Sequence, residues 1–225
     1  TLSGGLTSSA DASINSVSVG KGANSVAGNT VLGESALDAS VSGGNNTALG
    51  FQALTSLTSG SGNVAVGSLA LDAITTASNN TALGFQALTA NTSGTKNTAL
   101  GNDSLKTVTT GNRNTGVGQI ALGFTSTGSD NTALGVDALK QNTSASNNTA
   151  VGSSALLANT TGADNTAVGA LALNANTTAS FNTALGYKSL TANTTGASNT
   201  SVGEAALRAN TTGSNNTALG QGALI

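Results

Sequence analysis

Residues 131–147 read N-T-A-L-G-V-D-A-L-K-Q-N-T-S-A-S-N, and residues 148–164 read N-T-A-V-G-S-S-A-L-L-A-N-T-T-G-A-D. The second stretch repeats the first at a period of seventeen residues, without insertion or deletion. The same pattern fills eleven complete units over residues 29–215 and a partial unit over residues 216–225. A fixed period of this kind is typical of a repeat architecture. We number the seventeen positions of each unit as columns 1 to 17.

Several columns hold one residue type throughout the array. Column 1 is Asn, column 5 is Gly and column 9 is Leu in all twelve units, while column 4 is always Leu or Val. In the two quoted units these columns are occupied by Asn131, Leu134, Gly135 and Leu139, and by Asn148, Val151, Gly152 and Leu156. A disordered low-complexity segment has no reason to keep such columns, so we expect a folded repeat.

The composition excludes several classes of protein. The chain of 225 residues has no Cys and no His, which excludes disulfides, thiol or imidazole catalysis and ordinary zinc sites. It has seven basic and nine acidic residues, which is too little positive charge for a nucleic-acid binder. It also has no apolar run of the length that spans a bilayer.

A period of seventeen residues predicts an all-β, parallel β-solenoid. Helical repeats need about 33 residues or more, and the recurrent Gly and Asn-Thr oppose helix formation. Columns 1–5 predict a short strand that ends at a Gly corner. Columns 6–9 predict a second short strand, and columns 12–17 predict return turns. Stacked coils about 4.8 Å apart would let identical Asn side chains hydrogen-bond along a rod about 55 Å long.

The apolar and charged columns predict which sides face protein and which face water. Columns 6, 7, 10, 11, 16 and 17 hold nearly all the charges and are expected to face solvent, whereas the invariant columns are expected to face protein. Each coil offers two large apolar side chains, in columns 4 and 9. If one column fills the interior and the other lies on a flank, the second forms an apolar stripe that requires a partner. Association of identical rods about a symmetry axis is the simplest solution.

Residues 15–28, N-S-V-S-V-G-K-G-A-N-S-V-A-G, form a shorter unit before the array. This unit resembles one coil of the head repeats of YadA-like trimeric autotransporter adhesins, and the later units resemble a longer variant of the same left-handed β-roll. Arrays of similar units occur in phage tail-fibre-like proteins and in large surface proteins with an endosialidase-type chaperone domain. The resemblance implies a homotrimer of intertwined or side-by-side rolls on a cell or virion surface. It divides the chain into an irregular leader (1–14), one 14-residue coil (15–28) and the array of 17-residue coils (29–225).

Three aromatic residues are the candidate ligand contacts. Phe51, Phe85 and Tyr187 stand in column 6, directly after the corner Gly, where a side chain is expected to project outward. Exposed rings are common contact groups for sugars and proteins. The alternative is that they cover neighbouring strands or a groove between subunits. Phe124 in column 11 and Phe181 in column 17 are weaker candidates of the same kind.

Three further patterns receive less weight. Asp130 and Asp164, two coils apart in column 17, could imitate a carboxylate pair, but a solvated surface is the simpler interpretation. Asn142-Thr143-Ser144 matches a glycosylation acceptor, a match that an Asn-Thr repeat forces. Hydroxyls in columns 13 and 14, such as Thr160 and Thr161, raise the possibility of ice binding, but adjacent residues of an extended segment point to opposite sides.

These observations predict a non-enzymatic, extracellular structural and adhesive rod that binds no cofactor or metal. Its expected partners are two further copies of the chain and a host receptor, glycan or matrix surface, with no nucleic acid and no membrane insertion. The alternatives are a self-assembling extracellular filament, a phage tail-fibre shaft and, with least support, an ice-binding protein.

Overall fold

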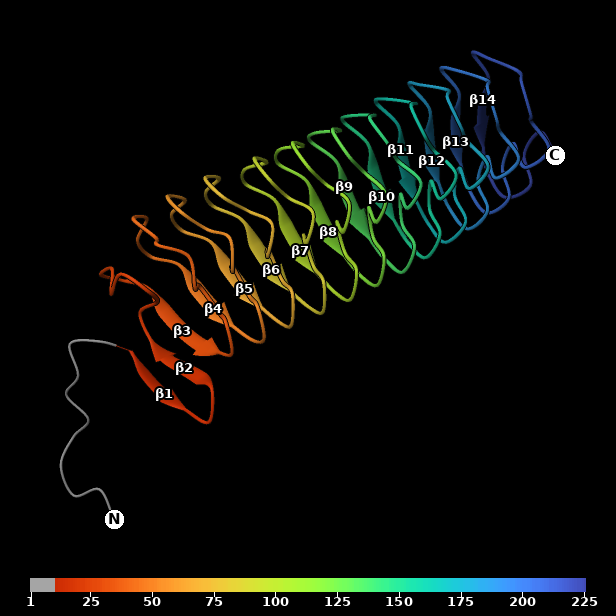
Figure 1. Cartoon of the computed structure of the whole chain (residues 1–225). Coiled ribbons are helices and arrows are strands. Elements are labelled where there is room, and N and C mark those ends of the chain that lie inside the picture. Colours follow the sequence, from red (N-terminus) through yellow and green to blue (C-terminus); the bar gives the residue numbers. More distant parts are fainter. Residues whose placement is uncertain (1–10) are drawn as a thin grey trace.

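The computed structural model describes residues 11–225, which form an elongated rod with strands stacked along it (Figure 1). Every strand contributes to one sheet in chain order. The strands are β1 Ala12–Ile14, β2 Val17–Gly20, β3 Thr30–Gly33, β4 Thr47–Leu49, β5 Val64–Val66, β6 Thr81–Leu83, β7 Thr98–Leu100, β8 Thr115–Val117, β9 Thr132–Leu134, β10 Thr149–Val151, β11 Thr166–Val168, β12 Thr183–Leu185, β13 Thr200–Val202 and β14 Thr217–Leu219. No helix occurs in residues 11–225, and that part of the chain therefore holds no long apolar helix able to cross a membrane.

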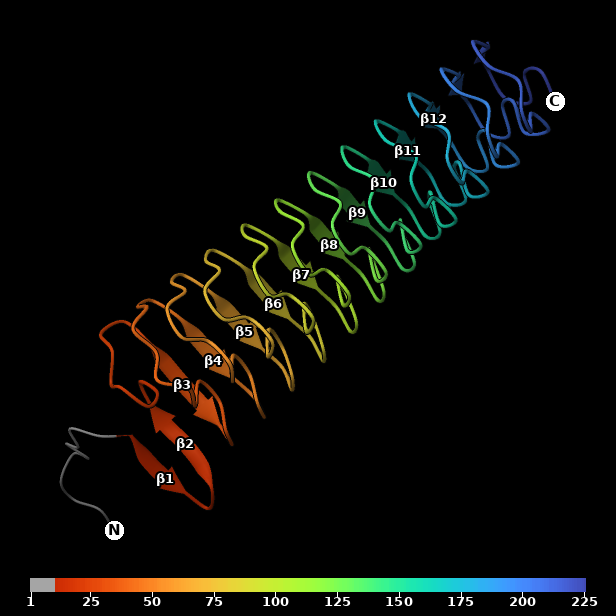
Figure 2. The same ribbon diagram turned by 45° about the horizontal axis from the view of Figure 1, so that its top comes forward.

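From β3 onward the strands are parallel and in register at the repeat period. Thr132 pairs with Thr149, Ala133 with Ala150, and Leu134 with Val151, and the same columns meet along the rest of the array. Each coil therefore lies on the previous one, as the turned view also shows (Figure 2). The predicted all-β parallel β-solenoid of 17-residue coils is confirmed.

From β4 onward each strand ends one residue before the column 5 glycine, because the chain turns there with a backbone that favours Gly. Gly135 has φ 138° and Gly152 has φ 128°. A Cβ on Gly135 would lie 2.7 Å from the carbonyl carbon of Gly152 in the next coil. The invariant glycine thus serves both the corner and the close approach of successive coils.

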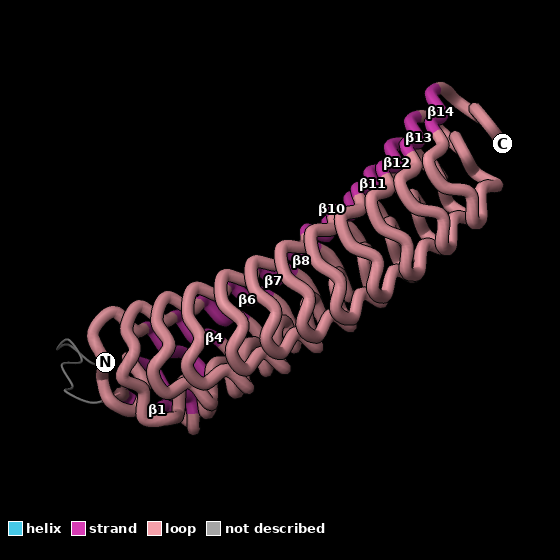
Figure 3. The backbone as a smooth tube through the Cα atoms, turned by 90° about the horizontal axis from the view of Figure 1, so that it is seen from above, coloured by secondary structure: helices cyan, strands magenta, loops and turns pink. Residues whose placement is uncertain are grey.

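The second strand expected over columns 6–9 does not form, and this expectation is wrong. Columns 7 and 9 take positive φ in coil after coil, as Asp137 (58°) and Leu139 (51°) do. A left-handed residue at every second position bends the chain into successive turns, which precludes an extended strand. Only one side of each coil is strand, and the rest is turn and loop (Figure 3).

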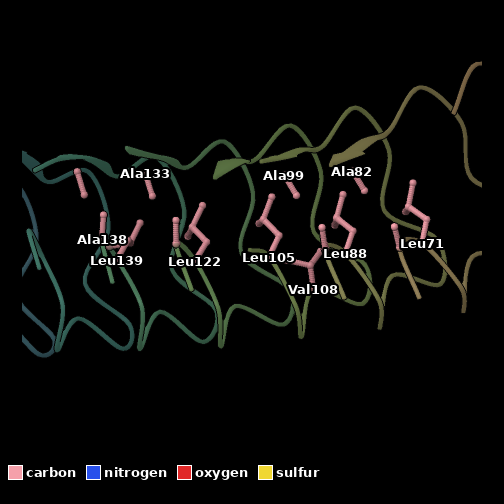
Figure 4. Close-up of a cluster of buried hydrophobic side chains, with 14 of the residues drawn as sticks. Leu71, Ala82, Leu88, Ala99, Leu105, Val108, Leu122, Ala133, Ala138 and Leu139 are labelled. Atoms are coloured by element: carbon pink, nitrogen blue, oxygen red, sulfur yellow. The ribbon is translucent and has the colours of Figure 1, made fainter. Parts of the chain in front are cut away.

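The interior of the rod is filled by column 9 leucines and small residues. Leu139 and Leu156 are fully buried, and the same holds for the column 9 leucines from residue 37 to residue 190. The strands present column 3 to this interior, usually as Ala, and column 8 adds a second row of small residues. Figure 4 shows the strand alanines Ala82, Ala99 and Ala133 facing the leucine row. Full burial of each leucine contributes about 1.5–3 kcal/mol.

The column 1 asparagines form the predicted hydrogen-bonded ladder. Asn131 and Asn148 are fully buried. The backbone N–H of Asn148 donates to Oδ1 of Asn131 at 3.0 Å, and its side-chain amide donates to the same oxygen at 3.3 Å and to the carbonyl of Gly162 at 2.9 Å. The buried amides are thereby satisfied without water, which explains why Asn occupies this column in every unit.

The N-terminal end departs from the expected division of the chain. Strand β2 pairs antiparallel with β3, so residues 15–28 do not stack as a parallel coil on the array. Strand β1, which falls in the leader expected to be irregular, forms a hairpin with β2. Asp11 fixes this hairpin by accepting hydrogen bonds from the backbone N–H groups of Lys21 and Gly22, both at 2.6 Å. Residues 1–10 of the expected leader lie outside the described residues.

Candidate interaction surface

The outward side of the parallel sheet is an uncharged surface that runs the length of the array. Side chains alternate along a strand, so columns 2 and 4 face outward where column 3 faces inward. Leu134 is 47% exposed, and Val151 is partly exposed. We call the outward residues of columns 2 and 4 the sheet face. It comprises eleven Thr and one Val in column 2 and seven Leu and five Val in column 4.

This arrangement corrects the expectation that all invariant columns face protein. Column 4 is always Leu or Val and column 9 is always Leu, yet column 4 is exposed because it lies one position beyond the inward-facing residue of the strand. The flanking stripe of the alternative considered above is therefore present. Because column 9 is enclosed by its own coil, only column 4 remains free to face another chain.

The column 6 aromatic residues project outward, as expected. Phe51, Phe85 and Tyr187 are 45%, 49% and 47% exposed. The Lys188 ammonium lies 5.0 Å from the centre of the Tyr187 ring, a distance suited to a cation–π contact. These rings are spread over distant coils and form no single cluster. Their role as ligand contacts stays a prediction.

A second asparagine ladder occupies column 12, and the sequence reading did not identify it. Asn142 is buried and donates to the carbonyl of Ala145 at 3.0 Å, and Asn159 donates to Oδ1 of Asn142 at 3.2 Å. Earlier coils place Leu57, Ile74 and Val108 in the same buried column. Because the Asn142 side chain is enclosed and bonded, the asparagine of the acceptor motif belongs to the core, in agreement with its low weight.

The carboxylates do not form an acid–base pair. Arg113 donates to both oxygens of Asp130, with distances of 2.6 and 2.7 Å. These hydrogen bonds lower the pKa of the Asp130 carboxyl below its ordinary value, the opposite of what a general acid requires. Asp164 lies two coils further along the same column. Within residues 11–225, no group of three or more acidic residues gathers as a metal site would require.

Of the hydroxyls considered for ice binding, those of column 13 are bonded to the backbone of the next coil. The Thr160 hydroxyl donates to the carbonyl of Thr177 at 3.0 Å, and the Thr143 hydroxyl donates to the carbonyl of Thr160 at 3.1 Å. Column 13 thus joins successive coils and is not a free array of hydroxyls.

One hollow of about 160 Å³ opens on the coil 114–130. It is lined by Asp103, Lys106, Thr107, Ile120, Gly123 and Phe124. From the sequence, Phe124 was a weaker candidate than the column 6 rings, and the hollow was not predicted. The available signal was the replacement of polar residues by Ile and Gly in columns 7 and 10, between two coils that carry Asp and Lys there.

Comparisons of the chain with protein-family models, with curated proteins and with solved structures each find no significant match. The resemblance to YadA-like head repeats and to tail-fibre-like arrays therefore stays a prediction.

Proposed function

We propose that this chain is a rigid extracellular rod, without enzymatic activity, that lengthens a fibre and displays a repetitive surface for attachment. The observation that supports this most strongly is the sheet face. It is uncharged and repeated at one spacing over twelve strands from β3 to β14, so an identical chain matches its pitch along the whole length. Three chains that pack these faces around one axis would cover the exposed leucines and leave columns 6, 7, 10 and 11 outside.

The size of the sheet face is adequate for such an assembly. Twelve strands about 4.8 Å apart and about 10 Å long give a footprint on the order of 550 Å² on each chain. Three such footprints around one axis then bury about 1,650 Å² in total, or about 550 Å² between each pair of chains, so the specific assembly depends on all three contacts forming together. Assembly also multiplies weak contacts made by the displayed side chains, because three copies act together.

The mass in solution tests the proposal. Light scattering is expected to give three times the chain mass of 21.4 kDa. Leu134→Lys together with Val151→Lys places two charges in the sheet face and is expected to yield folded monomers. Gln141→Lys together with Leu157→Lys adds the same charge in columns 11 and 10, outside the sheet face, and is expected to leave the trimer intact. A wild-type chain that is monomeric by light scattering and has a β-rich circular dichroism spectrum would overturn the trimeric rod.

The filament alternative receives less support from the N-terminal end. A head-to-tail polymer needs the last coil of one chain to continue onto the first parallel coil of the next. Strands β2 and β1 lie on that side of β3, and β2 runs in the opposite direction. Electron micrographs of purified protein should therefore show discrete rods, and long fibres would favour the filament. An adhesin and a tail-fibre shaft would both be discrete rods in such micrographs.

Ice binding remains a second candidate. The surface that favours it is the sheet face, and not the hydroxyls of columns 13 and 14. Thr132 and Leu134 point outward two residues apart, and this pairing of Thr with Leu or Val recurs along a regular sheet. Such a regular array of hydroxyl and methyl groups can order water. The two proposals use the same surface and exclude one another. Thermal hysteresis by a monomer would support ice binding, and a trimer without hysteresis would end it.

A further inference from the structure

The hollow lies where coil 114–130 departs from the coils on both sides of it. The coils before and after it carry Asp103 with Lys106 and Asp137 with Lys140 in columns 7 and 10. In the coil between them, column 7 holds Ile120 and column 10 holds Gly123, which is the only glycine of that column. Phe124 is the only aromatic residue in column 11, which is Ala in seven units. Three adjacent departures thus produce one apolar recess.

Two of these departures, Ile120 and Gly123, depend on each other. A Cβ on Gly123 would lie 2.5 Å from Cγ2 of Ile120, so Ile120 can occupy its place only because residue 123 is glycine. Ile120 has φ 57° and is the only β-branched residue with positive φ among residues 11–225. Such a residue is strained in this conformation, and backbone strain concentrates at functional sites.

The recess is also held rigidly by the coils on both sides. The Thr107 hydroxyl donates to the carbonyl of Gly123 at 3.1 Å and to that of Thr125 at 3.0 Å. The backbone N–H of Phe124 donates to the carbonyl of Lys140 at 3.0 Å. The recess is therefore formed before any ligand arrives, which lowers the entropic cost of binding.

The charges beside the recess are balanced. Lys106 lies 3.0 Å from Asp103, and Lys140 lies 3.0 Å from Asp137. An ion pair on each side gives no net charge, so the site has no preference for an anion or a cation. A carboxylate and an ammonium that pair with each other still retain capacity to accept and donate further hydrogen bonds.

We propose that this recess binds a single neutral sugar ring of a surface glycan. A pyranose presents an apolar C–H face, which suits Phe124 and Ile120, and a rim of hydroxyls, which suits Asp103 and Lys106. The volume of about 160 Å³ accommodates one six-membered ring, since a cavity of about 150 Å³ holds benzene. A purely apolar group of a protein partner would make no use of the hydrogen-bonding capacity that this pair retains. The inference deepens the proposed display function by naming a ligand class, but it does not require the trimer.

Saturation-transfer difference NMR on the full chain tests this inference. The probes are the methyl glycosides of glucose, galactose, mannose and N-acetylglucosamine, each at millimolar concentration. At least one is expected to receive saturation at the protons of its C–H face. Phe124→Ala restores the common residue of column 11 and is expected to weaken binding at least tenfold. Leu157→Ala removes an apolar side chain from column 10 two coils beyond the recess and is expected to leave binding unchanged.

A second variant fills the recess without altering the coil. Ile120→Asp, Gly123→Lys and Phe124→Thr together recreate the residues of the preceding coil, so the variant should fold and lose binding. Absence of transfer to all four glycosides, or equal transfer with Phe124→Ala, would overturn the inference. Stronger transfer to p-cresol that Phe124→Ala abolishes would overturn it in favour of an aromatic side chain. Light scattering on the same samples separates the two proposals, because a trimer that binds no glycoside overturns only the sugar site.

Discussion

The two columns of large aliphatic residues, column 4 and column 9, differ in environment although each holds an aliphatic residue in every unit. Leu139 in column 9 is fully buried inside its own coil, whereas Leu134 in column 4 of the same coil is 47% exposed on the sheet face. Column 9 follows a left-handed turn that directs it inward, and column 4 follows the alternation of a strand whose middle residue faces the core. An aliphatic residue in every unit therefore shows that a position is constrained, but it does not show whether the side chain faces the interior of the coil or the outer surface.

Aspartate substitutions in one coil should separate these two columns most strongly. Leu139→Asp places a charge in the dry interior, and removal of the leucine alone costs about 2.7–5 kcal/mol. We expect loss of cooperative unfolding, measured by circular dichroism during heating. Leu134→Asp should retain the β-rich spectrum and impair only association. Lys140→Ala, at the surface of the same coil, should change stability by less than about 1 kcal/mol. Equal effects at positions 134 and 139 would show that the two columns are not on opposite sides.

The two asparagine ladders provide the next comparison. Asn148→Leu removes the side-chain oxygen that accepts the hydrogen bond of the buried Asn165 N–H, and column 1 holds no residue other than Asn. The substitution should therefore cost about 1–3 kcal/mol. Asn142→Leu should cost less, because column 12 already holds Leu57 and the Asn159 amide keeps a bond to the Gly162 carbonyl. Urea denaturation measures both. A larger loss at position 142 than at position 148 would contradict the difference between the ladders.

An effect of similar size is expected where columns 3 and 8 meet across successive coils. Ser104 donates to the carbonyl of Gly116 at 2.9 Å, and a Cβ on Gly116 would lie 2.7 Å from the Ser104 hydroxyl oxygen. Gly116→Ala should therefore destabilise the rod by about 1–3 kcal/mol through overpacking. Adding Ser104→Ala restores the usual Ala–Ala contact and should recover the stability. A double variant no more stable than Gly116→Ala would refute this coupling.

The smallest effect is expected at the exposed surface of the coils, at Arg113 and Asp130. The pKa of Asp130 is lowered in the folded state, so its contribution to stability is present above its ordinary pKa of 3.8 and is lost as the pH falls through the lower folded value. At pH 7 Asp130→Asn should melt slightly below the wild type, and the two should coincide in strong acid. The difference should also shrink in high salt, because the pair is exposed. A gap that widens in acid would contradict the sign.

The sequence predicted the coil length, the strand, the Gly corner and the column 1 ladder because each depends on the identity of a repeated residue. It did not predict the turns at columns 7 and 9, because Leu and Asp carry no signal that they adopt positive φ. The side of column 4 could not be decided, since two apolar columns satisfied the same pattern. The pairing of Ser104 with Gly116 was visible as a coincidence twelve residues apart, but its meaning required the contact.

The N-terminal reversal and the hollow were missed for a related reason. Residues 15–28 carry a strand pattern that parallel and antiparallel pairing both satisfy, and the direction of β2 depends on the turns that flank it. The hollow depends on the absence of a side chain at Gly123, which becomes informative only when Ile120 is placed beside it.

The covering of the sheet face by identical chains is tested most directly by distances between spin labels. The chain contains no Cys, so Val151→Cys and Lys140→Cys each provide a single labelling site, the first on the sheet face and the second outside it. Pulsed electron paramagnetic resonance on the purified protein should give a short distance between chains for residue 151 and a longer one for residue 140. No dipolar coupling at residue 151, or a shorter distance at residue 140, would contradict the proposed assembly.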